Sequence, residues 1–398
     1  MTTYTVSRRG FVAVLTTAGG GLLLGCQMGE RSRAAAAAAA ASPPAFTPNA
    51  FIRIGTGGRV TLIMNQVEMG QGTYTAMPML LAEELEVGLD QVQLEHAPPD
   101  DKRYANPLFG DQETGASSSV RAFYEPLRRA GATARAMLVA AAAQTWDVDP
   151  ASCRAKRGVV THHPTGRTLT YGALAEKAAK LPVPDKVPLK DPKAFTLIGT
   201  PAKRLDTPDK VNGKAQFGID VRLPGMKIAT VAASPVLGGK VAGLDEAKAM
   251  AIKGVRQIVK LGDVVAVVAD DMWAAKQGLA ALAIRWDDGP NGSMSTADVV
   301  QGLDAASQQP GVVARKQGEG AAALAGAAQQ IDAVYQVPFL AHATMEPMNC
   351  TVHVRKDGCE VWTGSQVLTR AQATAARVTG LPLEKVVEIG RASCRERV

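Results

Sequence analysis

The stretch Gln66-Val67-Glu68-Met69-Gly70-Gln71-Gly72-Thr73 decides how the first part of this chain folds. The alternating segment Arg59–Met64 precedes it, and the apolar run Tyr74–Leu85 follows it. This order predicts a strand, a tight glycine turn and a helix. Glycines at such a turn let a ligand come close to the backbone because they carry no Cβ. The helix N-terminus then offers free N–H groups and partial positive charge to an anion.

The residues of the turn suggest what that ligand would be. Gln71 adds an amide that can both donate and accept hydrogen bonds. We therefore expect a phosphate or a pterin-like edge to lie against Gly70, Gln71, Gly72 and Thr73. Glycine turns also join strands to helices in many folds that hold no cofactor, so the turn alone does not establish the site.

A second candidate lies at Gly115-Ala116-Ser117-Ser118-Ser119, just before the expected helix Val120–Trp146. Serines at a helix start are caps in the first place, since their hydroxyls accept from backbone N–H groups. The hydroxyls of Ser117, Ser118 and Ser119 can also donate to a phosphate over the same helix end. Both roles remain open at this point.

Charge and composition exclude some function classes. The net charge of +7 is uneven: +3 lies in residues 1–33 and +2 in residues 391–398, so the long middle part carries only +2. The basic balance therefore gives no argument for nucleic acid, and the low aromatic content of 5% speaks against stacking platforms. None of the five cysteines forms a C-x-x-C pair, so no iron–sulfur or zinc motif is indicated.

The N-terminus has the form of a targeting signal. Ser7-Arg8-Arg9-Gly10-Phe11 is a twin-arginine pattern, and the apolar run behind it is too short and too rich in glycine to span a bilayer comfortably. We expect export by the Tat route to the periplasm. Leu23-Leu24-Gly25-Cys26 resembles a lipoprotein cleavage box, so a membrane anchor through Cys26 is a further hypothesis.

Further along, a hairpin is expected near Gly158–Leu169 with His162 and His163 at its tip, and Leu181–Lys193 reads as a proline-rich extended connector. Strands are expected at 228–233, 255–261, 264–269 and 331–338, with helices at 245–251 and 272–283. Cys350 and Cys359 flank a second expected hairpin and could pair in an exported protein, although spacing alone does not fix the geometry. No residue is assigned as catalytic or as a metal ligand.

Taken together, five motifs in order resemble the large subunit of molybdenum hydroxylases of the xanthine oxidase family, of the isoquinoline 1-oxidoreductase beta-subunit or membrane-bound aldehyde dehydrogenase type. They are the leader, the turn at Glu68–Thr73, Leu127–Ala132, the module from Lys210 to Trp286, and His342–Pro347 with Trp362–Gln366. The resemblance implies an α+β fold with molybdopterin-binding-type α/β domains and an inserted α/β hammerhead. The expected division is signal 1–33, Ala/Pro linker 34–50, molybdopterin-binding-like domain 51–205, hammerhead 206–290, start of a further molybdopterin-binding domain 291–390, and foreign translated tail 391–398.

The resemblance also implies a function. The family binds molybdopterin cytosine dinucleotide, hydroxylates an aldehyde or N-heterocycle, and passes electrons to a separate small subunit with two iron–sulfur clusters, with a membrane cytochrome as a further candidate partner. The turn at Gly70–Gly72 would face the cofactor's pterin or phosphates, and Ser117–Ser119 its phosphate. His342 and Glu346 would lie near the substrate funnel or at a domain contact, and a buried structural pairing is an equal alternative.

The chain departs from the family pattern at its end. No residue matches the family's C-terminal catalytic glutamate, and the glycine-rich loop expected after Val387 is missing. We therefore expect an N-terminal fragment that is inactive alone. Two other hypotheses remain, an exported binding or scaffold module with the same fold and, less favoured, a nucleotide-binding protein. The latter lacks an acidic residue on a following strand to hold a ribose.

Overall fold

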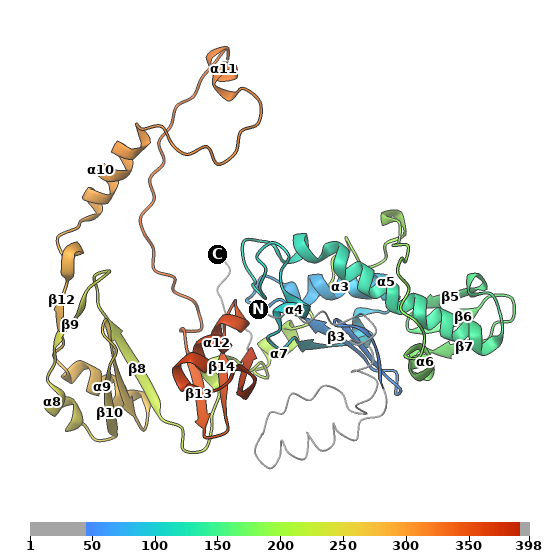
Figure 1. Cartoon of the computed structure of the whole chain (residues 1–398), viewed down its shortest axis with the longest axis horizontal. Coiled ribbons are helices and arrows are strands. Elements are labelled where there is room, and N and C mark those ends of the chain that lie inside the picture. Colours follow the sequence, from blue (N-terminus) through green and yellow to red (C-terminus); the bar gives the residue numbers. More distant parts are fainter. Residues whose placement is uncertain (1–44, 391–398) are drawn as a thin grey trace, which may run out of the picture. The chain divides into compact units, whose positions relative to one another are not determined.

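The structure is a computed structural model that describes residues 45–390. The predicted twin-arginine signal, Cys26 and the tail at 391–398 lie outside the described residues. The chain divides into two compact units. The first unit comprises Met1–Val221 and His342–Val398, and the second comprises Arg222–Ala341. The domain boundaries expected from the sequence stay predictions. Figure 1 colours the elements of both units along the sequence.

The first unit is built on a four-stranded sheet in the order β1-β2-β3-β4, in which only β3 and β4 are parallel. The strands are β1 (Ala45–Asn49), β2 (Ile52–Gly55), β3 (Val60–Met64) and β4 (Val92–His96). β1 lies within the residues expected as the Ala/Pro linker 34–50. Pro48 speaks against a strand, but β1 lies at the sheet edge, where a missing backbone donor is tolerated.

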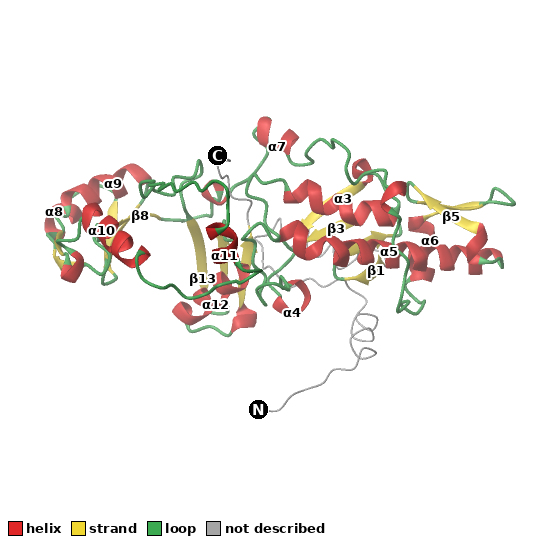
Figure 2. Cartoon of the chain, turned by 90° about the horizontal axis from the view of Figure 1, so that it is seen from above, coloured by secondary structure: helices red, strands yellow, loops and turns green. Residues whose placement is uncertain are grey.

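Two helices cover this sheet, α3 (Thr73–Leu85) and α5 (Ser119–Trp146). They lie side by side (Figure 2). Their close approach depends on Gly131, because a Cβ there would stand 2.4 Å from the carbonyl oxygen of Leu81. The main core lies between the two helices and the face of the sheet that carries Ile52 and Leu62. The predicted strand–turn–helix unit and the long helix are thus confirmed.

The remaining elements of the first unit form two small sheets and short helices. The hairpin expected near residue 160 is confirmed, and β14 pairs in parallel with β15 under α12. The elements are α4 (Asp101–Tyr104), β5 (Cys153–Lys156), β6 (Val159–His162), β7 (Thr168–Thr170), α6 (Tyr171–Ala178), α7 (Thr207–Val211), β13 (Cys350–Arg355), β14 (Gly358–Thr363), α12 (Leu368–Thr379) and β15 (Val386–Gly390).

The second unit holds a three-stranded antiparallel sheet in the order β10-β11-β8 and a two-stranded sheet of β9 and β12. The elements are β8 (Ile228–Ala233), β9 (Lys240–Gly243), α8 (Glu246–Met250), β10 (Val255–Lys260), β11 (Val264–Ala269), α9 (Met272–Ala281), β12 (Arg285–Asp287), α10 (Thr296–Ser307) and α11 (Gly320–Ala325). The three strands and two helices expected between 228 and 283 are confirmed to within two residues at each end.

One expected strand is absent, and one possible disulfide is not formed. Residues 331–338 form no strand, and Ile331, Val334 and Tyr335 are each at least 87% exposed, because no neighbouring strand in the described chain pairs with them. Cys350 and Cys359 are free. They lie on neighbouring strands, but Cys350 is opposite Thr363 and Cys359 opposite Val354, so the register separates them along the hairpin.

Among the described residues, no helix has the length and apolar character needed to cross a membrane.

Candidate functional site

The glycine turn has the backbone that the sequence predicts. Gly70 and Gly72 have φ values of 103° and 89°, in the region that side chains disfavour. Gly72 is the N-cap of α3, and the N–H groups of Thr75 and Ala76 donate to its carbonyl. The space where a Cβ of Gly72 would point is open to 4 Å. The turn therefore presents bare backbone at the start of a helix.

The anion position at this helix end is occupied by the chain itself. The carboxylate of Glu68 accepts from the backbone N–H groups of Gly70 at 2.7 Å, Gly72 at 3.1 Å and Tyr74 at 2.9 Å. The hydroxyl of Thr73 adds a contact at 3.3 Å, and Glu68 is only 1% exposed. The expectation that these N–H groups are free for a ligand is therefore wrong, because an internal carboxylate satisfies them.

Arg204 closes this arrangement from another segment. Its guanidinium donates to Glu68 Oε1 at 2.9 Å and to the carbonyl of Gly70 at 2.8 Å, and it also pairs with Asp206. Burial alone would raise the pKa of Asp206, but hydrogen bonds from Arg204 and Lys210 more than offset it and lower the pKa to about 2. The turn is thus tied to residues more than 130 positions away in the sequence.

Gln71 and Thr73 also make bonds within the loop. The Gln71 carboxamide accepts from the N–H of Met69 at 2.5 Å and donates to the carbonyl of Val67 at 2.9 Å, although the residue is exposed. Thr73 is buried, and its hydroxyl bonds to Val67 and Glu68. Of the four residues expected to face a cofactor here, only Gln71 is exposed, while Gly70 and Gly72 are partly buried.

The three serines at the start of α5 differ in exposure: Ser118 is buried, Ser119 is half-buried and Ser117 is exposed. Ser118 is buried, donates to the carbonyl of Gly115 and accepts from Asn106. Ser119 donates to Oε1 of Gln66 at 2.9 Å. Ser118 is the N-cap residue, yet its side chain caps no N–H group, so the expected capping role is wrong: these hydroxyls bond to other partners instead.

Ser117 lies on the open side of this helix end. Ser117 and Ala116 both have positive φ, 53° and 48°, which is uncommon without glycine and often marks functional positions. Ser117 and Arg121 are exposed. With no side-chain cap, the first N–H groups of the 28-residue helix α5 remain available to an anion.

Three predicted motifs meet at one place in the first unit. Gln66, at the start of the glycine stretch, bonds to Ser119, and the N–H of Val67 donates to the hydroxyl of Thr114 at 3.0 Å. Thr114 in turn pairs with Gln366: its N–H donates to the Gln366 carbonyl at 2.9 Å, and the Gln366 side chain donates back at 2.6 Å. The glycine turn, the serine stretch and the Trp362–Gln366 motif are therefore one hydrogen-bonded assembly.

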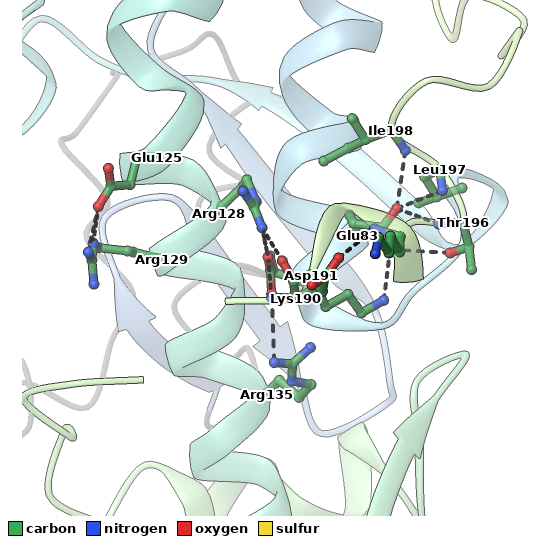
Figure 3. A network of polar contacts seen from close by, with 12 residues as sticks. Glu83, Glu125, Arg128, Arg129, Arg135, Lys190, Asp191, Thr196, Leu197 and Ile198 are labelled. Carbon is green, nitrogen blue, oxygen red and sulfur yellow. Dashed lines mark hydrogen bonds and ion pairs between the residues drawn. The ribbon is translucent and has the colours of Figure 1, made fainter. Parts of the chain in front are cut away.

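The Leu127–Ala132 motif has a different role, which Figure 3 shows. Arg128 donates twice to the buried Glu84, at 3.0 and 2.8 Å, and once to the carbonyl of Lys190. The N–H of Lys190 also donates to Glu84. With Gly131 at the crossing of α3 and α5, the motif holds two helices and the proline-rich connector together. Its contacts are structural.

Next to it, Glu83 fixes the segment that follows the connector. Its fully buried carboxylate accepts from the ammonium of Lys190 at 2.7 Å and from the successive N–H groups of Thr196, Leu197 and Ile198 at 2.9, 2.6 and 3.1 Å (Figure 3). Burial opposes ionisation, but these bonds outweigh it and lower the pKa of Glu83 to about 2.

Tyr74, the second residue of α3, forms a half-buried pair with His96. Tyr74 Oη and His96 Nδ1 are 2.6 Å apart, and the Nε2 atom of His96 is buried without a partner. Burial lowers the pKa of His96 to about 4 and, with the charges of Glu68 and Asp206, raises that of Tyr74. A cavity of about 300 Å³ adjoins Tyr74, and the residues expected at the cofactor site do not line it.

His342 and Glu346 have different environments in the structure. His342 is exposed. Glu346 is 8% exposed and accepts from the N–H of Ile219 at 3.1 Å and from the side chain of Asn349 at 2.9 Å. For Glu346 the alternative of a buried structural pairing therefore holds. No group of three or more potential metal ligands occurs within residues 45–390.

Sequence reasoning placed Glu68 in the turn but missed its carboxylate, and Arg204, as the groups that hold the turn. A signal for Glu68 was present, since an acidic residue four positions before the glycine N-cap of a helix can reach forward to its N–H groups. Arg204 carries no such local signal, because its partners lie far away in the sequence.

Comparisons with known proteins identify the family. Models of the molybdopterin cofactor-binding domain match residues 19–230 and 305–392. The chain is 33% identical to isoquinoline 1-oxidoreductase subunit beta of Brevundimonas diminuta, over 86% of this chain and 49% of the relative. It is 27% identical to a membrane-bound aldehyde dehydrogenase [pyrroloquinoline-quinone] of Gluconacetobacter polyoxogenes, over 96% of this chain and 50% of the relative.

Among solved structures, quinoline 2-oxidoreductase from Pseudomonas putida 86 matches 48% of this chain and 30% of its own, with 15% identity and a TM-score of 0.36. The chain spans about half the length of the curated relatives it matches. The first family model alone covers more than half of the chain, and the second includes the Trp362–Gln366 motif. The chain therefore belongs to the molybdopterin cofactor-binding domain family.

Proposed function

We propose that this chain forms one wall of the molybdopterin site in an exported oxidoreductase that hydroxylates an aldehyde or an N-heterocycle. The observation that carries the proposal is the assembly in which Gln66, Thr114, Ser119 and Gln366 join three distant motifs by direct hydrogen bonds. A scaffold without a ligand would not need uncapped N–H groups at the start of α5 beside this assembly. The names of the relatives support the substrate classes.

The residues present fit such a cofactor at two places. The start of α5 suits a phosphate, because its N–H groups are uncapped and Ser117 and Arg121 are exposed beside it. The turn at Gly70–Gly72 suits the pterin edge, because Gln71 is exposed and carries both a donor and an acceptor. The N-terminus of α3 does not suit a phosphate, since Glu68 already occupies it.

When bound, the cofactor would supply the metal-centred oxygen and electron transfer that side chains cannot perform. The chain's own residues would bind and orient it. Ser117 and the α5 N–H groups would hold the anionic end, and Gln71 would fix the pterin. We further propose the cytosine dinucleotide form, an iron–sulfur subunit as electron acceptor, and Tat export to the periplasm, all from the family resemblance and the leader Ser7–Phe11.

The test compares two variants of the full-length subunit expressed with its natural partners. Ser117→Asp places a carboxylate where the phosphate would lie, and a negative charge at a helix start does not destabilise the helix itself. Thr296→Asp, at the exposed first residue of α10, is the matched control because it also places a carboxylate at a helix start. We expect Ser117→Asp to lower molybdenum and pterin content about tenfold, the effect of roughly 1.4 kcal/mol of lost binding, with Tm unchanged.

Wild-type protein that contains neither molybdenum nor pterin would favour the non-catalytic binding module instead. Unchanged cofactor content in Ser117→Asp would show that the phosphate does not bind at the start of α5.

A further inference from the structure

We propose that Glu68 and Arg204 are a positioning pair: Glu68 is the permanent anion of the α3 N-terminus, and the pair holds the Gly70-Gln71-Gly72 turn in the shape that meets the cofactor. Only the claim that the turn meets the cofactor rests on the proposed function. Glu68 is not expected to touch the cofactor, since it is 1% exposed and its carboxylate is bonded to the N–H groups of the turn. The guanidinium of Arg204 is engaged by Glu68, Gly70 and Asp206.

The geometry of Glu68 is that of a bound anion. Its carboxylate receives three backbone N–H bonds from alternate residues, Gly70, Gly72 and Tyr74, at 2.7–3.1 Å. These are the donors that an external phosphate would need at a helix start. A carboxylate supplied by the chain is present at all times, so the turn is formed before any ligand arrives.

Arg204 makes the arrangement rigid. One of its terminal nitrogens donates to Glu68 Oε1 at 2.9 Å, and the other donates to the carbonyl of Gly70 at 2.8 Å. The same side chain therefore holds both the anion and the backbone that surrounds it. Asp206 accepts from the remaining edge of the guanidinium at 3.0 and 2.8 Å, which fixes its plane.

A phosphate cannot share this position. Its negative charge would lie beside the buried carboxylate, and the helix end has already compensated one anion. Displacing Glu68 would also leave Arg204 without one of its two acidic partners. What the turn offers outward is Gln71, whose orientation depends on the loop carbonyl of Val67 and the N–H of Met69.

The first test asks whether an anion belongs at this helix end. In the cofactor-free full-length subunit, Glu68→Ala leaves the N–H groups of the turn without an acceptor. We expect its Tm to fall, and to recover with inorganic phosphate in a saturable manner at constant ionic strength. Phosphate at the start of α5 is open to both proteins, so the wild-type Tm should rise less than that of Glu68→Ala. Equal phosphate effects on the two proteins, or a Glu68→Ala variant as stable as wild type in chloride, would overturn the proposal.

Should Glu68→Ala fail to fold, Glu68→Gln keeps the volume and removes the charge. Amide hydrogen exchange at Gly70, Gly72 and Tyr74 should then accelerate about tenfold, the effect expected for one charge-assisted bond. Glu125→Gln on the exposed face of α5 is the control, with exchange at the turn unchanged. No acceleration in Glu68→Gln would contradict the proposal.

The second test addresses positioning. Cofactor dissociation from the loaded subunit, followed by released pterin fluorescence, should be about tenfold faster in Glu68→Gln and in Arg204→Lys, which cannot bridge Glu68 and Gly70 in a fork. The double variant should be no faster than either single one if the two act as a unit. Additive effects of the two substitutions, or dissociation rates equal to that of wild type, would refute the proposal that Glu68 and Arg204 act as a unit. The phosphate experiment stays decisive for Glu68 even if the wild type binds no pterin.

Discussion

Replacing Glu83 by glutamine should release the segment Thr196–Ile198 from α3. Oε2 of Glu83 accepts the three successive N–H groups of this segment, while Oε1 accepts from the ammonium of Lys190. A glutamine carboxamide has only one oxygen. If that oxygen keeps the three N–H groups, its NH₂ group faces the Lys190 ammonium, and two donors oppose each other.

The magnitude follows from the pKa of Glu83, which the fold lowers from 4.5 to about 2. Because a tenfold preference for the ionised form is worth about 1.4 kcal/mol, the carboxylate contributes about 3 kcal/mol at pH 7. A lowered pKa means that this contribution is complete above pH 4.5 and is lost as the pH falls from about 4.5 towards 2. Glu83→Gln should therefore cost about 3 kcal/mol at neutral pH and less in acid.

Hydrogen exchange of the amides of Thr196, Leu197 and Ile198 measures this locally, so the presence of two units does not complicate the result. About 3 kcal/mol corresponds to exchange on the order of 100-fold faster at these amides. Glu125→Gln removes an exposed pair with Arg129 and should change stability by less than about 0.5 kcal/mol. Wild-type exchange at the three amides in Glu83→Gln would refute the reasoning.

Two further predictions concern packing and pH. Gly131→Ala should destabilise the first unit by about 1–3 kcal/mol in chemical denaturation, because its Cβ would meet the backbone oxygen of Leu81, whereas Gly302→Ala in the open middle of α10 should stabilise by about 0.5–1 kcal/mol. Burial lowers the pKa of His96 from 6.5 to about 4, so the folded state favours the neutral ring and stability should fall by about 3 kcal/mol between pH 6.5 and 4. His96→Gln should abolish that fall, and the exposed His163→Gln should keep it; a fall of equal size in all three proteins would be inconsistent with this assignment.

Much of the fold could be predicted because its signals are local. The strand at 228–233 is β-branched and apolar between turn residues, and the structure has it at those residues. The strand expected at 331–338 has an equally good pattern, yet it is absent, because a strand also requires a neighbour to accept its hydrogen bonds. Residue patterns describe one segment, whereas pairing is a property of two.

The candidate site shows the same limit. The glycine turn and the long helix were predictable from spacing, and so was the approximate position of the serines. Whether Glu68 or a ligand accepts from the N–H groups of the turn could not be predicted, since either can satisfy them. The pairing of Thr114 with Gln366 joins residues 252 positions apart, and no local signal reports it.

The most direct test of the central claim is the cofactor content of the full-length subunit in which Gln366 is replaced by leucine, measured as molybdenum and released pterin per protein. Gln366→Leu removes one of the two hydrogen bonds by which Thr114 and Gln366 join the third motif to the other two, and it leaves the backbone bond in place. The account predicts equal molar molybdenum and pterin in the wild type, and a parallel loss of both in the variant with retained folding. Full cofactor content in Gln366→Leu, or none in the wild type, would contradict it.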